Sequence, residues 1–94
     1  MFREFKQLVD VYDEDEDGND ILLKRDAVIR DSFYVDSIVS VTEALNRNGN
    51  PYKSRCFIYH AERGNILLKH PYKEIVELKE EDELTRAGFK IRTK

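Results

Sequence analysis

SRCFIYHAERGNILLKHPYKEIVELK, residues 54–79, is the stretch that decides the fold. Its first seven residues are rich in strand formers and are followed by a tight turn, in which Gly64 is placed to adopt a positive φ. Ile66–Lys69 is then the returning strand of a hairpin. Pro71 opens a helix, because proline is favoured in the first helical turn and apolar residues follow at i, i+3 and i+4 from Tyr72.

The helix carries Lys73, Glu74, Glu77 and Glu80 on its water-facing side. We expect it to end near Lys79, because the negative charges of residues 81–83 are unfavourable near a helix C-terminus. Leu84–Gly88 then forms a second, short helical turn that Gly88 caps.

Upstream, the clearest loop is Asn46–Pro51, which combines residues that tolerate left-handed backbone angles with a proline, so it joins two strands. The strand before it runs through Ile38–Val41 toward Leu45. Phe33–Val35 belongs to the same strand-forming segment, with Asp36-Ser37 as a turn or bulge between the two parts.

At the N-terminal end, Leu8–Tyr12 is a predicted strand that leads into an acidic stretch, residues 13–20, with a Gly18-Asn19 turn. The returning strand is Ile21–Lys24. Residues 27–29 either extend this strand or begin an irregular excursion through residues 30–32.

The sequence thus predicts an α+β fold, a small antiparallel β-sheet of about five hairpin-connected strands with one amphipathic helix packed on it. With 94 residues the chain fits a single domain, residues 1–94, with an acidic hairpin loop at 13–20 and a basic tail at 85–94. Phe89–Arg92 alternates like a C-terminal edge strand, and a tail without regular structure is the alternative.

Residues 33–79 resemble the small flagellar regulatory proteins of the FlbD type and the short phage proteins that share their pattern. The stretches that carry the resemblance are Asp36–Val41, Cys56–Tyr59, Gly64–Leu68 and Glu74–Val76. The resemblance implies a compact β-sheet with a docked helix. The acidic loop, residues 26–33 and the basic tail depart from the pattern and suggest a phage or small bacterial accessory protein.

The net charge of −3 makes a general nucleic-acid binder unlikely, because phosphate contacts require clustered Lys and Arg. Cys56 is the one cysteine and has no intramolecular disulfide partner. No apolar stretch approaches the ~20 residues that a membrane span needs, and no secretory signal is visible. We therefore expect a cytoplasmic protein that does not bind a membrane.

Asp13–Gly18 satisfies the first half of a calcium loop, in which alternate carboxylates converge on a hard cation. The second half fails, because Asp20 stands where an aliphatic residue is expected and Lys24 replaces the bidentate glutamate. A flexible acidic hairpin tip explains the same residues, so we assign no metal site and no cofactor.

Arg55, Phe57 and Tyr59 alternate along the predicted strand and share one of its faces. Aromatic side chains beside an arginine suit base or nucleotide stacking, although burial of this face under the helix is the commoner arrangement. The predicted ligand-binding residues are Arg55, Tyr59, Arg63 and Arg92.

No catalytic residue is assigned. Cys56, His60 and His70 form neither a closed zinc set nor an activated nucleophile, and the sequence contains no phosphate-binding or nucleophile-elbow motif. Three hypotheses remain. The first is a non-enzymatic binding or regulatory module that forms a homo-oligomer and binds a host or phage protein or a small anionic ligand. The second is an oligomeric sponge that sequesters nucleotide signals of bacterial immunity, and the third is a cryptic enzyme around Cys56 and His60.

Overall fold

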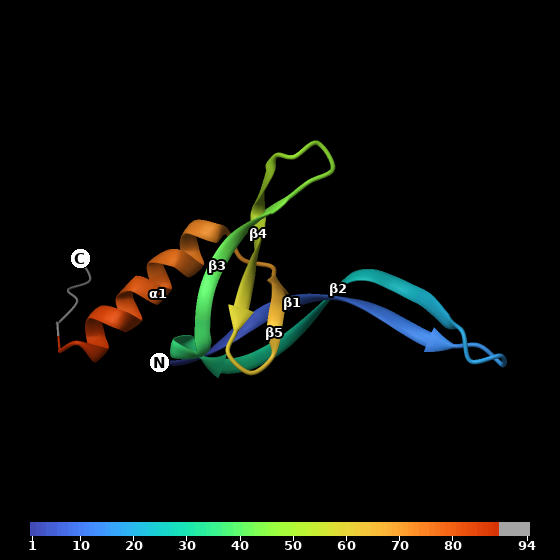
Figure 1. Ribbon diagram of the computed structural model, residues 1–94, viewed down its shortest axis with the longest axis horizontal. Helices are drawn as coiled ribbons and strands as arrows, with labels where there is room; N and C mark the ends of the chain where they lie inside the picture. Colours follow the sequence, from blue (N-terminus) through green and yellow to red (C-terminus); the bar gives the residue numbers. More distant parts are fainter. Residues whose placement is uncertain (89–94) are drawn as a thin grey trace.

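The structure is a computed structural model and describes residues 1–88 (Figure 1). A five-stranded antiparallel sheet carries one helix at its C-terminal end, which confirms the predicted α+β fold. The elements are β1 (Phe2–Glu14), β2 (Asp20–Tyr34), the 3-10 turn η1 (Val35–Ser37), β3 (Ile38–Leu45), β4 (Pro51–His60), β5 (Gly64–Leu68) and α1 (Tyr72–Arg86). The predicted strand Phe89–Arg92 lies outside the described residues.

The strands lie in the order β2-β1-β5-β4-β3, so β2 and β3 are the two edges of the sheet. In a flat sheet these edges would be about 19 Å apart, at ~4.8 Å per strand spacing. Only η1 joins them, and a 3-10 turn rises about 2 Å per residue. The sheet therefore curls until the end of β2 approaches the start of β3. The amide of Ala61 donates to the carbonyl of Ser37 at 2.8 Å, which extends the β3–β4 pairing into η1.

The turn that was one alternative for Asp36-Ser37 is present as η1, and it sends the chain from β2 to the opposite edge of the sheet. Phe33–Val35 and Ile38–Val41 are therefore not one strand interrupted by a bulge. The segment from residue 30 to residue 32 is also not an irregular excursion. It belongs to β2 and pairs with Glu4–Lys6 of β1, a stretch for which the sequence predicted no strand.

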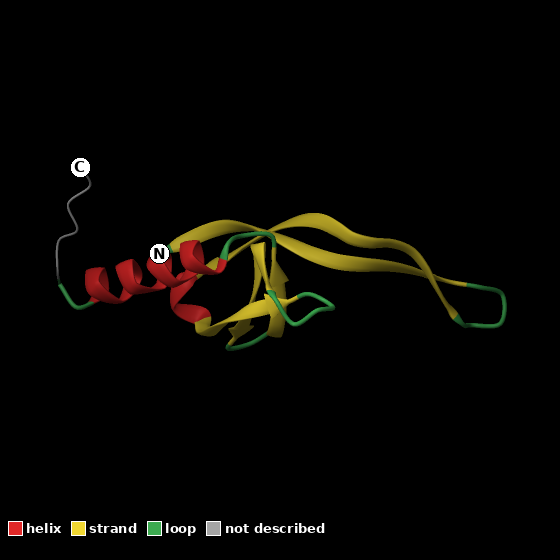
Figure 2. Cartoon of the chain, turned by 90° about the horizontal axis from the view of Figure 1, so that it is seen from above, coloured by secondary structure: helices red, strands yellow, loops and turns green. Residues whose placement is uncertain are grey.

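The core lies on the concave face of the sheet, where one side of α1 covers it (Figures 1 and 2). The predicted water-facing residues of α1 are exposed, as expected. The buried cluster contains Phe5, Phe33, Val35, Ile38, Cys56, Ile58, Ile66, Leu68, Ile75 and Leu78. Every strand contributes to this cluster, so both edges of the curled sheet pack with the helix in one core.

The helix is longer than predicted, because it continues past Lys79 to Arg86 without a break. The expectation failed because the acidic residues near its C-terminus are compensated. Asp82 is buried, and its carboxylate accepts from the Met1 amino group at 3.1 Å and from Arg86 at 3.2 Å. Lys79 pairs with Glu83 at 2.6 Å. These cations remove the repulsion with the helix dipole from which the early end was predicted.

A long arm, residues 10–26, extends beyond the rest of the sheet as a two-stranded ribbon (Figures 1 and 2). The molecule measures 56 Å along this direction against 29 and 21 Å across. At the root of the arm the register of β1 and β2 shifts at Val11. Asp26, in the same place, is the one non-glycine residue described with a positive φ, 53°. Bulges of this kind bend a strand, so the root sets the direction of the arm.

The arm ends in the loop at residues 15–19. The carboxylate of Asp15 accepts from the amides of Asp17 at 2.9 Å and Asn19 at 2.8 Å, and Gly18 has a φ of 80°. Two main-chain bonds close the loop, from Gly18 to the carbonyl of Asp15 and from Asp15 to the carbonyl of Asn19. The acidic loop is thus a hairpin turn that Asp15 stabilises from within.

The β3–β4 hairpin ends in the same loop. Asn46 takes the place of Asp15, and its side-chain oxygen accepts from the amides of Asn48 at 2.9 Å and Asn50 at 3.0 Å. Gly49 has a φ of 82°. Two hairpins in this chain therefore close with one five-residue geometry, which places glycine fourth because a side chain is disfavoured at positive φ.

Candidate binding surfaces

Arg55 lies near the root of the arm, on the outward side of β4. Its guanidinium pairs with Asp26 at 3.4 Å and lies over the ring of Tyr52, 4.5 Å from the ring centre. The amide of Asp26 donates to the carboxylate of Asp10 at 3.1 Å. Arg55 therefore helps to hold the left-handed residue that directs the arm. The sequence did not point to Asp26, because its partners Asp10 and Arg55 lie 16 and 29 positions away and local patterns do not show such pairs.

Tyr59 and Phe57 are on the outer face of the sheet, 47% and 39% exposed. The helix covers the opposite face, on which Cys56, Ile58 and His60 are buried. The helix therefore does not bury the face of β4 that carries Phe57 and Tyr59, although such burial is the commoner arrangement. The outer face of β4 is open to a ligand.

Arg63 lies in the β4–β5 turn and borders a cavity of about 300 Å³. It forms an ion pair with Asp31 and its guanidinium is 5.7 Å from the centre of the Phe33 ring. The exposed rings of Phe2 and Tyr34 stack beside the same cavity, 4.9 Å apart. Sequence reasoning missed this aromatic pair because it assigned no strand to residues 2–7.

His60 also borders this cavity and is 3% exposed. Its Nδ1 accepts from the amides of Glu62 and Arg63, each at 3.1 Å, so the proton of the neutral ring lies on Nε2. Nε2 is buried and has no hydrogen-bond partner within residues 1–88. The Phe33 ring packs against the imidazole in an edge-to-face arrangement at 5.0 Å.

The predicted ligand-binding residues are not gathered at one place. Arg55 is in the middle of β4, beside the root of the arm, and Arg63 is in the turn that follows the end of β4. Tyr59 is on the outer face between Ser40 and Asn65 and does not border the Arg63 cavity. Arg92 lies outside the described residues. Arg63 borders the cavity of about 300 Å³, which Arg55 and Tyr59 do not line.

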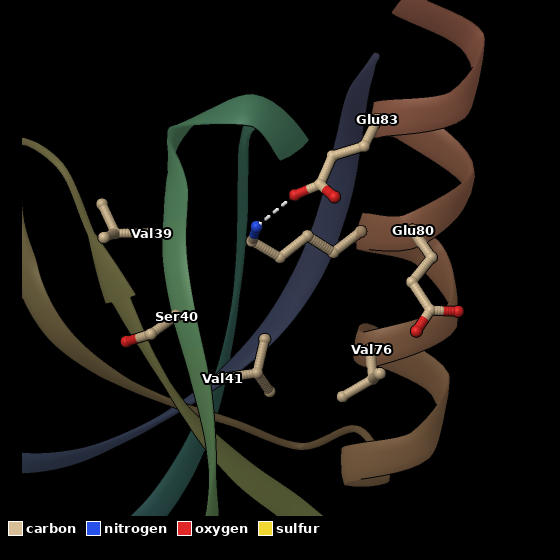
Figure 3. A pocket seen from close by; sticks show the side chains of 7 residues that line it. Val39, Ser40, Val41, Val76, Glu80 and Glu83 are labelled. Atoms are coloured by element: carbon tan, nitrogen blue, oxygen red, sulfur yellow. Dashed lines mark hydrogen bonds and ion pairs between the residues drawn. The ribbon is translucent and has the colours of Figure 1, made fainter. Parts of the chain in front are cut away.

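A groove of about 240 Å³ separates edge strand β3 from α1 (Figure 3). Val41 and Val76 face each other across it, and Glu80 and Glu83 project from the helix along its side. Val39 and Ser40 belong to the strand wall. Sequence reasoning did not find this groove, because it predicted neither that β3 is an edge nor that the helix reaches residue 83.

No group of three or more His, Cys, Asp or Glu side chains within residues 1–88 is arranged to hold a metal ion. In the acidic loop, backbone amides already engage the carboxylate of Asp15. This agrees with the interpretation of residues 13–20 as a hairpin tip.

Cys56 and the two histidines have structural surroundings. Cys56 is fully buried, and that burial, with a smaller effect from the charge of Glu74, raises the pKa of its thiol to about 11. A nucleophilic cysteine needs a lowered pKa and access, and nothing within residues 1–88 gives Cys56 either. His70 Nε2 accepts from the amide of Lys6 at 3.0 Å, while its Nδ1 lies 3.3 Å from Glu74. It therefore ties β1 to the start of α1.

Comparison of the chain with protein-family models, with curated proteins and with solved structures gave no significant match. The resemblance of residues 33–79 to FlbD-type proteins stays a prediction, and the binding surfaces must be judged from their own chemistry. No helix in the described part of the chain is both long enough and apolar enough to cross a membrane.

Proposed function

We propose that this protein is a non-enzymatic binding module that associates with a second copy of itself through the arm. The observation that supports this proposal is the set of apolar side chains that the arm exposes on its two faces, where Tyr12 and Leu23 are 56% and 61% exposed and Val11 and Ile21 are also exposed. A two-stranded ribbon is marginally stable alone in water. Packing these side chains against another surface removes them from water and stabilises the ribbon.

Charge favours a second copy as the partner. The arm carries six carboxylates between Asp13 and Asp20. The β3–β4 hairpin carries Arg47 and Lys53 close to its own loop, with the exposed side chains of Leu45 and Tyr52 beside them. One end is acidic and apolar, and the other is basic and apolar. Reciprocal docking of each arm on the partner's β3–β4 hairpin satisfies both surfaces in one symmetric contact.

Size-exclusion chromatography with light scattering tests this proposal. The natural chain is expected to be dimeric at tens of micromolar, and Tyr12→Ser with Leu23→Ser is expected to make it monomeric. Leu84→Ser is the matched control, because Leu84 is also exposed but lies on α1. A natural chain that stays monomeric at millimolar concentration contradicts the proposal.

A second candidate function is the sequestration of a small anionic ligand, such as a nucleotide, in the Arg63 cavity. Its support is the Nε2–H of His60, which has no acceptor within residues 1–88, beside the Arg63 guanidinium and the stacked rings of Phe2 and Tyr34. The cavity is at the lower limit for small-molecule sites. Asp31 neutralises Arg63, so a ligand phosphate must displace that carboxylate.

Calorimetry against cyclic and ADP-ribose-derived nucleotides tests the second candidate. Binding that Arg63→Gln abolishes and Arg47→Gln preserves supports it, because Arg47 lies in the β3–β4 loop and does not border the cavity. The absence of heat with every nucleotide removes it.

A further inference from the structure

The free edge of β3 and the groove beside it form a second interaction surface. In the strand order β3 has β4 as its one neighbour, so its other edge has no strand partner within residues 1–88. An unpaired edge presents a row of main-chain donors and acceptors that can take up another strand. In Figure 3 the side chain of Val41 points from β3 toward α1, so the helix lies over this face of the strand and leaves the main-chain edge beside it open.

The groove supplies side-chain contacts to match that edge. Val41 and Val76 line it from the strand and from the helix (Figure 3). Lys79 also lines it and pairs with Glu83. Glu80, which also lines the groove, has no ion-pair partner among the described residues. A segment lying between β3 and α1 would meet an apolar floor and an acidic wall.

We propose that β3 binds an extended peptide by strand addition, and that the peptide alternates apolar side chains with Lys or Arg. The main chain of the peptide pairs with the edge of β3, its apolar side chains enter the groove between Val41 and Val76, and its cations face Glu80. Strand addition gives affinity through the main chain, while the groove and its charge give selectivity. This proposal does not rest on self-association, since the groove is lined by Val39–Val41 and α1, whereas the arm of a second copy is proposed to dock beside Leu45 and Tyr52 near the β3–β4 loop.

Sequence selectivity is tested first, by titration of the ¹⁵N-labelled full-length chain. The probe peptide is GFKIRTK, which has the sequence of residues 88–94, and the control peptide is GFEIETE. A chain with Phe89→Ser and Ile91→Ser is titrated as well, so that the chain's own copy of this sequence does not compete. The probe is expected to shift the amides of residues 39–42 and 76–83, and the control peptide to shift none of them. No shift at either segment with millimolar probe overturns the proposal.

Strand addition is tested with two probes that are N-methylated at adjacent positions, on the first Lys or on the Ile. Successive amides of an extended peptide point to opposite sides, so one methyl group blocks the bonds to β3 and the other faces away. Loss of binding with one probe and not the other supports main-chain pairing. Equal binding of the two probes overturns it.

The acidic wall is tested with Glu80→Lys and the matched control Glu77→Lys, which lies on α1 outside the groove. Reversing an exposed charge that faces a cation is expected to lower the affinity for the probe peptide by about threefold to tenfold at low salt. The control is expected to leave the affinity unchanged. Equal affinities for the two variants contradict the role of Glu80.

Discussion

The β1–β2 and β3–β4 hairpins close with the same five-residue loop but differ in what lies beneath it. Both hairpins contain register shifts, but the β3–β4 hairpin is rooted at Ile58, which is 1% exposed in the core, whereas the root of the arm is formed by Asp26 with a left-handed backbone. The loops also differ in charge, since one is acidic and the other carries Arg47. The comparison shows that loop geometry, support by the core and surface charge are set by separate residues in this chain.

The largest expected difference concerns support by the core. Ile58→Ala, at the root of the β3–β4 hairpin, is expected to lower the free energy of unfolding by about 2–5 kcal/mol, because it leaves a cavity. Leu23→Ala in the arm is expected to change it by less than about 0.5 kcal/mol in the monomer. Urea unfolding at low protein concentration measures both values. Similar losses would mean that the arm is part of the cooperative core.

Alkaline pH is expected to lower the free energy of unfolding, because Cys56 in β4 is buried as a neutral thiol. Its pKa is raised to about 11, above the ordinary 9.0, so the folded chain keeps a proton that the unfolded chain loses. The stability that this group contributes is complete below pH 9 and is lost as the pH rises toward 11. The loss is up to about 2–3 kcal/mol. The free energy of unfolding, measured with urea at pH 8 and pH 10.5, is expected to fall less between these pH values for Cys56→Val than for the natural chain. An equal fall in both chains would contradict ionisation of Cys56 as the cause.

The loop glycines separate global from local stability. Gly18→Ala and Gly49→Ala each place a Cβ at a positive φ, which costs about 1 kcal/mol. For Gly49→Ala we expect the free energy of global unfolding to fall by this amount. For Gly18→Ala it is expected only as faster hydrogen exchange of the arm amides, because the arm opens without the core. A global loss of equal size in both variants would show that the two hairpins are equally coupled to the core.

The smallest effect on stability is expected when the aspartates of the acidic loop are replaced by the asparagines that stand at the same places in the β3–β4 loop. Asp15→Asn with Asp17→Asn should change the free energy of unfolding by less than about 0.5 kcal/mol, since Asn46 already holds the same geometry with an amide oxygen. Asp15→Ala is the contrasting variant and should expose the amides of Asp17 and Asn19 to exchange. The double variant should also make self-association less dependent on salt. Faster exchange of those amides in the double variant would show that the loop needs its charge.

Turn chemistry made much of the fold predictable. Gly18-Asn19, the Asn46–Pro51 loop and Gly64 each located a hairpin that the structure contains. The N-terminal part of β1 was not predicted, because its partners come from residues 29–34 and from Leu68. The full length of the helix was missed for a similar reason. The buried ion pair of Asp82 with the Met1 amino group joins residues 81 positions apart.

The binding surfaces were less predictable than the fold. Both faces of β4 carry apolar side chains, so the sequence could not decide whether the helix covers Phe57 and Tyr59 or Cys56 and Ile58. The curl of the sheet decides it, and the curl depends on η1 joining opposite edges. The Arg63 cavity likewise needs Phe2, which reaches it through pairing with Tyr34. These surfaces depend on contacts between distant residues, which local patterns do not encode.

The position of β1 in the sheet also bears on the order in which the chain is made. β1 meets β5 at Gln7 and Leu68, and Lys69 donates to the carbonyl of Lys6 at 2.8 Å. The ribosome delivers β1 and β2 first, so the β1–β2 hairpin waits with an open edge until some thirty further residues have followed it. Sheets that close through such distant pairs fold slowly and expose their edges during synthesis. Before β3 and β4 have been made, the acidic residues at the tip of this hairpin repel the same residues of another nascent chain, which disfavours pairing of the two open edges.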